Sequence, residues 1–327
     1  MTAPPPDTPA GLYRTVRLIR RFEERAIELV TSGEIVGGIH PYIGQEAVAA
    51  GVCAALRRDD LITSTHRGHG HVLAKGADPA RMLAELAGRA TGLNQGRGGS
   101  MHAADFALGI LGANAIVGAN APITAGAAWA ARRSGRDTVA VSFFGDGAVN
   151  QGVLLEALNL AALWRLPVLF VCENNGYATT LTVENAVAGT VTGRAEAFGI
   201  PAVTIDGMDP QTVLEAARQA VHRARTGAGP TFVECLTYRF DAHHTWEHRA
   251  RIRYRDDEEV RRARSRDPVS IQAARLTPED RARADAEIEA VLDDAVAFAR
   301  AAPHPDPADA LDHLYATGLR PRPGGGA

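Results

Sequence analysis

The chain contains few cysteines, a single lysine and no long apolar run. Cys53, Cys172 and Cys235 are its three cysteines, at irregular spacing among 327 residues. So sparse and odd a count argues against a disulfide framework. No stretch of about 18 apolar residues is present to span a bilayer. The proline-rich start lacks the basic and apolar regions of a signal peptide, so we expect a cytoplasmic protein without a membrane partner.

An excess of one charge sign is also lacking. The net charge is −3, from 35 basic and 38 acidic residues. A nucleic-acid binder usually concentrates basic residues on one face, whereas the arginine-rich stretch from Arg249 to Arg266 mixes both signs. We therefore expect no nucleic-acid partner and a solvated helix in this stretch. Lys75 is the only lysine and alanine is abundant, which indicates GC-rich, bacterial coding and carries no information on function.

Apolar patterns in the middle of the chain predict an α/β protein with a doubly wound, mostly parallel sheet. Val139–Phe144 and Val168–Cys172 are apolar runs without alternation, which is typical of strands covered on both faces. Val153–Trp164, between them, has helical length and composition, so the three form a parallel crossover unit. Further strands are predicted at 202–205 and 231–237, and helices at 11–31, 45–56, 211–225 and 278–300.

We expect four parts along the chain. Residues 1–9 are predicted to be a disordered lead, 10–260 an α/β domain, 261–320 a helical C-terminal extension and 321–327 a flexible tail. The segment 94–120 is rich in glycine and has little periodicity. A long irregular segment inside a compact domain is usually functional or mobile, so this segment is a candidate functional region.

Polar clusters follow the two clearest strands. Gly145-Asp146-Gly147 ends the first and Asn174-Asn175 ends the second. Because carboxyl ends of parallel strands meet at one edge, Asp146 and Asn175 can reach one small cation if the strands are neighbours. Oxygen donors suit magnesium or calcium, and magnesium completes its octahedron with phosphate oxygens and water. The two glycines let a phosphate approach the backbone, and a helix start near Asn150 offers amides to it, so the cluster predicts a metal-diphosphate site.

Other interpretations of these clusters stay open. A lone Gly-Asp-Gly turn is more often structural. A nicotinamide-binding module is disfavoured because Asn150 stands where G-x-G-x-x-G requires its third glycine. A zinc site could in principle use six histidines, but no cysteine or carboxylate spacing supports it. Hydrogen-bonded loop histidines describe His71, His244 and His248 better; the other three are His66, His69 and His243.

The pairing of Gly145-Asp146-Gly147 with Asn174-Asn175 resembles the thiamine diphosphate signature. The segment between them, from Glu156 to Val168, is similar to the alpha subunit of the thiamine diphosphate-dependent first component of 2-oxo acid dehydrogenase complexes, of the pyruvate and acetoin dehydrogenase type. The resemblance runs from about Gly11 to Tyr315 and includes 42–47, 98–102 and 206–209. It implies that residues 10–260 form a thiamine diphosphate-binding fold that also holds Mg²⁺.

The resemblance implies a role for each matching residue. Asp146 and Asn175 would bind Mg²⁺ by their side chains and Tyr177 by its carbonyl. Arg67 would clamp the diphosphate, a task that suits its planar fork, and His66 stands where some members carry a tyrosine on the same phosphates. The full set of expected cofactor-binding residues is His66, Arg67, Ala115, Val117, Gly145, Asp146, Gly147, Ala148, Asn175, Tyr177 and His243.

Within that set, the resemblance implies that Val117 keeps the cofactor bent and that the Ala115 carbonyl accepts from its amino group. The family often has glycine at the Ala115 position, so this is a departure. His69 and His243 match the histidines that line the substrate side. We therefore expect both to be catalytic.

The resemblance also implies an enzyme of two kinds of chain. A beta subunit supplies the glutamate that activates the cofactor, and this chain is too short for both halves, so we expect an α2β2 heterotetramer. The enzyme would cleave the C–C bond next to a ketone, in acetoin or pyruvate, and pass the acyl unit to a lipoyl-bearing acyltransferase component. The alternative is a carboligase without a lipoyl partner.

The substrate stays open at the sequence level. Residues 102–114 are most similar to the acetoin branch of the family, with the pyruvate branch next. Asp241–His248 departs from all branches, because Ala242 replaces the expected glycine and Trp246 follows the matching histidine. The ketone or 2-oxo acid is therefore not assigned from these motifs.

Overall fold

The structure, a computed structural model, describes residues 4–250 and 252–312. The tail predicted at 321–327 lies outside these residues, as do the first three residues of the predicted lead and the last part of the predicted C-terminal extension. The first helix begins at Pro9, where Thr8 caps it by accepting from the Gly11 amide. The boundary predicted at 260 falls within a helix, Asp257–Arg264.

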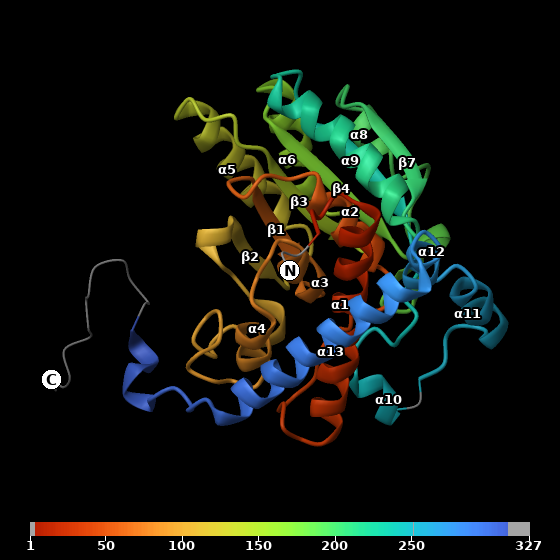
Figure 1. The fold of residues 1–327 in the computed structure, drawn as a ribbon. Coiled ribbons are helices and arrows are strands. Elements are labelled where there is room, and N and C mark those ends of the chain that lie inside the picture. The colour runs from red at the N-terminus through yellow and green to blue at the C-terminus, as the bar shows by residue number, and fades with distance from the viewer. Residues whose placement is uncertain (1–3, 251, 313–327) are drawn as a thin grey trace, which may run out of the picture.

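A parallel six-stranded sheet forms the centre of the molecule (Figure 1), which confirms the predicted doubly wound α/β class. Its strand order is β2-β1-β3-β4-β8-β7. The strands are β1 (Leu61–Thr65), β2 (Ile110–Asn114), β3 (Ala140–Gly145), β4 (Val168–Asn174), β7 (Ala202–Asp206) and β8 (Thr231–Leu236). A small antiparallel pair, β5 (Tyr177–Ala178) and β6 (Leu181–Thr182), follows β4.

Helices cover both faces of the sheet. They are α1 (Pro9–Thr31), α2 (Glu46–Ala54), α3 (His69–Ala74), α4 (Pro79–Leu86), α5 (Asn120–Arg133), α6 (Gly152–Leu163), α7 (Val183–Ala186), α8 (Gly193–Glu196), α9 (Pro210–Arg225), α10 (Trp246–Ala250), α11 (Asp257–Arg264), α12 (Pro268–Ala273) and α13 (Pro278–Ala301). Short 3₁₀ turns lie at η1 (Gly99–Met101), η2 (Phe106–Leu108), η3 (Asp146–Ala148) and η4 (Pro307–Leu311).

Side chains of β3 point alternately to the two faces of the sheet and take part in two separate hydrophobic cores. Val141 and Phe143 pack into a core shared with α1, α2, α9 and α13. Ala140 and Phe144 pack into the opposite core, with α5, α6 and α8. Because successive side chains of a strand point to opposite faces, an apolar run without alternation fills both cores at once.

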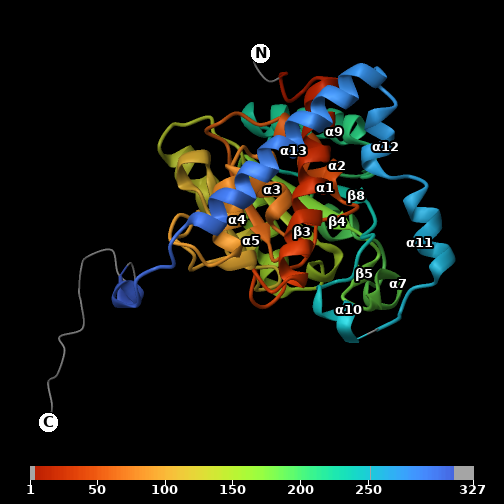
Figure 2. The same cartoon turned by 60° about the horizontal axis from the view of Figure 1, so that its bottom comes forward.

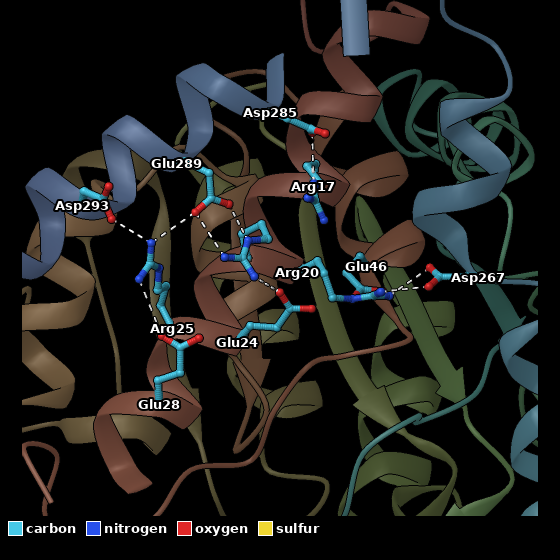
Figure 3. Close-up of polar contacts among 11 residues, drawn as sticks. Arg17, Arg20, Glu24, Arg25, Glu28, Glu46, Asp267, Asp285, Glu289 and Asp293 are labelled. Carbon is cyan, nitrogen blue, oxygen red and sulfur yellow. Dashed lines mark hydrogen bonds and ion pairs between the residues drawn. The ribbon is translucent and has the colours of Figure 1, made fainter. Parts of the chain in front are cut away.

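Helix α13 crosses over α1 and α4 (Figure 2) and is joined to α1 by a row of ion pairs. Arg17 pairs with Asp285 and Arg25 with Asp293, both at the partly exposed helix–helix seam that Figure 3 shows. The same view shows a buried pair beside the seam, in which Arg20 bonds Glu46 and also Asp267. The C-terminal extension is thereby fastened to the first helix of the chain.

Several elements were not predicted or differ from the prediction, among them two strands of the main sheet, helix α5 and the arginine-rich stretch. β1 and β2 were not predicted. β1 carries buried polar residues instead of an apolar run, and β2 lies within the segment expected to be irregular. The arginine-rich stretch forms only the end of α10 and the exposed α11, instead of one solvated helix. No helix among the described residues is long and apolar enough to cross a membrane.

The buried pair gives a test of the fold. Arg20 is 7% exposed and Glu46 is fully buried, so Arg20→Met leaves an uncompensated carboxylate in the core. We expect the free energy of unfolding to fall by about 3–5 kcal/mol. Arg21→Met, which removes a partly exposed pair with Glu289, is the control, with an expected loss of about 1 kcal/mol or less. Urea denaturation measures both, and equal losses would contradict the buried pair's role.

Candidate active site

A cavity of about 320 Å³ lies at the carboxyl ends of β1 to β4. It is lined by His66, Arg67, Ala115, Val117, Gly145, Asp146, Gly147, Ala148, Asn175, Tyr177 and His243, which is the full set of residues expected to bind a cofactor. These residues come from five separate parts of the chain. Parallel strand ends bring them together, as expected for ligand sites in open α/β sheets.

Asp146 and Asn175 meet because β3 and β4 are neighbours, with Gly145 opposite Glu173. Both side chains are buried. Burial raises the pKa of Asp146 to about 6, while hydrogen bonds from backbone amides, including that of Asn175, act in the opposite direction. The Asn175 side-chain amide group donates to Gln45 Oε1 at 2.9 Å, and its Oδ1 accepts from the Tyr177 backbone amide at 3.1 Å. The strand ends thus present a carboxylate and an amide oxygen to the same cavity.

The turn after β3 differs from the expectation in one respect. The 3₁₀ turn η3 intervenes, and α6 begins at Gly152, two residues after Asn150. The Asn150 side chain instead donates to the Ala186 carbonyl and accepts from Arg194. A Cβ on Gly147 would lie 2.9 Å from the Ala178 side chain, so this glycine is required for packing. Residues 145–148 of this turn line the cavity, and Asn150 does not.

Two buried arginines give the cavity its electrostatic character. Arg67 is 4% exposed and donates to the Pro41 carbonyl at 2.6 Å. Arg239 is 1% exposed and donates to the Thr179 carbonyl at 2.9 Å. Burial lowers the pKa of both guanidinium groups, that of Arg67 to about 9, and neither forms an ion pair with a carboxylate among the described residues. Buried charges need a counter-charge, so this wall favours a bound anion.

Sequence reasoning missed Arg239, although a usable signal was present. It stands just past the end of β8, at the same sheet edge as the Gly-Asp-Gly and Asn-Asn clusters. The sequence analysis also did not single out Gln45, which lies in the motif 42–47 used for the family resemblance.

Three histidines gather beside these arginines. The ring nitrogens of His40, His66 and His243 lie within 4.8 Å of one another. Burial, together with the neighbouring Arg67 charge, lowers the pKa of His66 and of His243 to about 3 and also lowers that of His40. The rings are therefore neutral at physiological pH, and the adjacent guanidinium groups oppose a further cation there. His40 was missed by the sequence analysis.

Two further histidines of the zinc interpretation are His71, which lies away from this group, and His244, whose ring contacts that of His40. His71 is fully buried, and its ring bonds Ser64 Oγ at 2.7 Å. His244 Nδ1 accepts from the Trp246 amide at 3.1 Å. The side chain of His248 lies outside the described part of the chain. Both His71 and His244 form hydrogen bonds, as the simpler interpretation predicted, but His71 lies in helix α3 instead of a loop.

His69 is not brought to the cavity wall. It is fully buried, with Nδ1 3.0 Å from Glu23 Oε1 and Nε2 2.9 Å from Ser100 Oγ. Both ring nitrogens are occupied by protein partners, so His69 does not face a substrate in this structure. Of the two histidines expected to be catalytic, only His243 lines the cavity.

The rim of the cavity is apolar and exposed. Ile116 and Val117 follow β2 and are 71% and 51% exposed. A cavity with a charged interior and an exposed apolar rim is typical of a site that a second chain covers.

Because Arg67 and Arg239 have no carboxylate partner in the part of the chain that the structure describes, we predict that diphosphate stabilises this protein. Inorganic diphosphate in large excess over its dissociation constant should raise the unfolding temperature by about 3 °C or more. Arg67→Met and Arg239→Met should each remove most of this shift, and Arg81→Met, on the exposed side of α4, should keep it. Thermal denaturation with and without diphosphate measures the shift, and an equal shift in all variants would exclude these arginines as the anion site.

One known family matches most of this chain. Residues 14–308 match the family described as dehydrogenase E1 component. The alpha subunit of acetoin:2,6-dichlorophenolindophenol oxidoreductase from Bacillus subtilis is 44% identical over 93% of this chain and 92% of its own. Its counterpart from Cupriavidus necator is 44% identical over 94% of both chains. The pyruvate dehydrogenase E1 component subunit alpha of Rhizobium meliloti is 43% identical over 90% of this chain and 86% of its own. With a family match over most of its length and relatives of this similarity, the chain belongs to the dehydrogenase E1 component family.

Proposed function

We propose that this chain is the alpha subunit of a thiamine diphosphate-dependent dehydrogenase. The enzyme cleaves the C–C bond next to a ketone, in acetoin or pyruvate, and passes the acyl unit to a lipoyl carrier. The E1 family in general uses thiamine diphosphate, and the relatives are named as alpha subunits of acetoin:2,6-dichlorophenolindophenol oxidoreductase and of the pyruvate dehydrogenase E1 component. These names favour the dehydrogenase over the carboligase. The observation that carries the proposal is one cavity with an acid–amide pair and two buried arginines that have no carboxylate partner among the described residues.

The residues present fit the diphosphate end of this cofactor. Arg67 and Arg239 are buried cations that lack a carboxylate partner among the described residues, and a diphosphate supplies the missing charge. Asp146, Asn175 and the Tyr177 carbonyl are hard oxygen donors of the kind that Mg²⁺ takes, with phosphate oxygens as its remaining ligands. We propose these three residues as the Mg²⁺ ligands.

The protein's own contribution is positioning and proton control. When bound, thiamine diphosphate supplies a nucleophilic carbon that can attack a ketone carbonyl. His243 Nδ1 lies 3.2 Å from Arg67 Nη2 and 3.3 Å from Arg239 Nη1, both of which can only donate. Nδ1 is therefore the acceptor, and the neutral ring carries its proton on Nε2. His243 can thus offer a hydrogen-bond donor to an oxygen in the cavity.

An exposed apolar face supports a second kind of chain in the assembly. Trp129, Leu160, Leu163 and Trp164, on α5 and α6, are between 36% and 70% exposed. Three of them border an apolar groove of about 390 Å³. The N-terminal end of α5 lies at the cavity, since Asn120 lines it, so one partner can cover both the face and the rim. We propose a beta subunit as this partner, in an α2β2 heterotetramer, with a lipoyl-bearing acyltransferase component as the acyl acceptor.

The metal assignment predicts the effect of one substitution. Asp146→Ala should abolish Mg²⁺-dependent binding of thiamine diphosphate by the assembled enzyme, because the cation loses its only carboxylate ligand among the proposed three. Asp206→Ala is a matched control, since Asp206 also precedes a glycine at a strand end but pairs with Arg266 instead. Calorimetric titration with and without Mg²⁺ measures binding. Wild-type binding by the Asp146 variant would refute the ligand assignment.

The two-chain proposal predicts that the chain is inactive alone. The purified chain should show negligible turnover of acetoin or pyruvate with an artificial electron acceptor, because the cavity rim is uncovered and the activating glutamate is supplied by the beta subunit. Addition of the beta subunit should restore turnover. Steady-state assays of the chain, the partner and their mixture measure this, and substantial turnover by the chain alone would contradict the proposal.

A further inference from the structure

The glycine-rich segment from Asn94 to Met101 wraps around one buried carboxylate, that of Glu85 on α4. Glu85 is fully buried. Its Oε2 accepts from the amides of Asn94 at 2.7 Å and Gly96 at 2.9 Å. Its Oε1 accepts from the amides of Gly98 at 2.7 Å and Gly99 at 3.0 Å. Four backbone donors converge on one side chain, and no arginine, lysine or histidine pairs with it in the described part of the chain.

The glycines of this segment are explained by the wrapping. A Cβ on Gly92 would lie 2.4 Å from Glu85 Oε2. Gly96 has a φ of +75° and a Cβ there would lie 2.6 Å from the Gly88 carbonyl carbon, while Gly99 has a φ of +57°. Side chains are excluded by contact at the first position and by backbone conformation at the others. The glycine pattern therefore serves the Glu85 carboxylate, which stands where a bound anion stands in a backbone nest.

The segment ends at the active-site cavity. Ser100 and Met101 belong to η1, directly after the amides that Glu85 holds. Ser100 Oγ lies 2.9 Å from His69 Nε2, and Met101 lines the cavity. On the outer side, Arg97 donates to the carbonyls of Asp309 and Asp312 at 2.8 Å. Residues 94–101 are thus held by Glu85 on the inner side, by Asp309 and Asp312 of the C-terminal extension on the outer side, and by His69 at Ser100.

We propose that Glu85 is a positioning residue, which keeps Met101 in place as a preformed part of the cavity wall. The expected effect of Glu85 on ketone binding rests on the proposed function. Its expected effect on the order of residues 94–101 does not. Glycine-rich backbone loses more conformational freedom on ordering than any other, and charge-assisted hydrogen bonds offset that loss. Without the hydrogen bonds to Glu85, residues 94–101 would become ordered only when substrate binds. The entropy lost in this ordering would weaken substrate binding.

The test uses Glu85→Gln in the assembled two-chain enzyme. Glutamine keeps the size of the side chain, but its amide group is a donor and faces two backbone donors. Hydrogen exchange should become at least about tenfold faster for the amides between 94 and 101, since a buried charged acceptor is lost. The KM for acetoin or pyruvate should rise several-fold while kcat changes little, as for loss of binding that is equal in ground and transition states. Glu85→Asp, which keeps the charge, should restore part of both.

The control is Asp60→Asn. Asp60 is also fully buried and accepts from backbone amides, those of Val139 and Arg57, but it pairs with Arg225 and lies at the amino end of β1, away from the cavity. Asp60→Asn should lower stability without changing exchange in 94–101 or KM. If Glu85→Gln does not fold, Met101→Ala tests the wall directly and should raise KM in the same way.

Unchanged exchange in 94–101 would overturn the positioning role of Glu85. Faster exchange with an unchanged KM would overturn the link to the cavity, as would an unchanged KM in Met101→Ala. If the wild-type assembly turns over neither ketone, the proposed function fails, but the exchange comparison still decides whether Glu85 holds the segment.

Discussion

The parallel pairing of β3 with β4 is the constraint on which the site depends. It places the ends of both strands at one edge, so that Asp146 and Asn175 face the same cavity although the whole of α6 separates them in sequence. β1 and β8 pair with the outer sides of the same two strands and bring Arg67 and Arg239 to the same edge. Oxygen ligands for a cation and guanidinium groups for an anion thus meet because of strand order alone.

The electrostatics of the cavity are incomplete without a ligand. Two buried arginines stand without carboxylate partners in the described structure, and the three histidines beside them are held neutral by burial and by those charges. Burying uncompensated charges destabilises the unliganded protein, and binding of an oppositely charged ligand offsets this destabilisation. Here the proposed ligand is a diphosphate with its bound Mg²⁺. The apolar rim of the cavity and the apolar face of α5 and α6 are also exposed to solvent. A partner chain bound there would bury both surfaces.

The sequence predicted the parts of this structure in which local pattern and global fold agree. β3 and β4 are apolar runs followed by polar turns, so both the strands and the residues at their ends were predictable. β1 was missed because Thr63, Ser64 and Thr65 are buried for their hydrogen bonds, which apolar periodicity does not detect. His69 was placed on the substrate side by resemblance, whereas its two partners, Glu23 and Ser100, come from distant segments and hold it in the core. Glu85 was missed because its hydrogen-bond partners are backbone amides, which cannot be recognised from a motif of side chains.

The most direct test of the account locates the cation. Crystals of the assembled protein grown with thiamine diphosphate and Mn²⁺ in place of Mg²⁺ allow the metal to be found by anomalous diffraction. The account predicts one peak at about 2.1–2.2 Å from a carboxylate oxygen of Asp146 and from Asn175 Oδ1, with diphosphate oxygens as further ligands. A peak among the rings of His40, His66 and His243 instead, with Asp146 and Asn175 unligated, would contradict it.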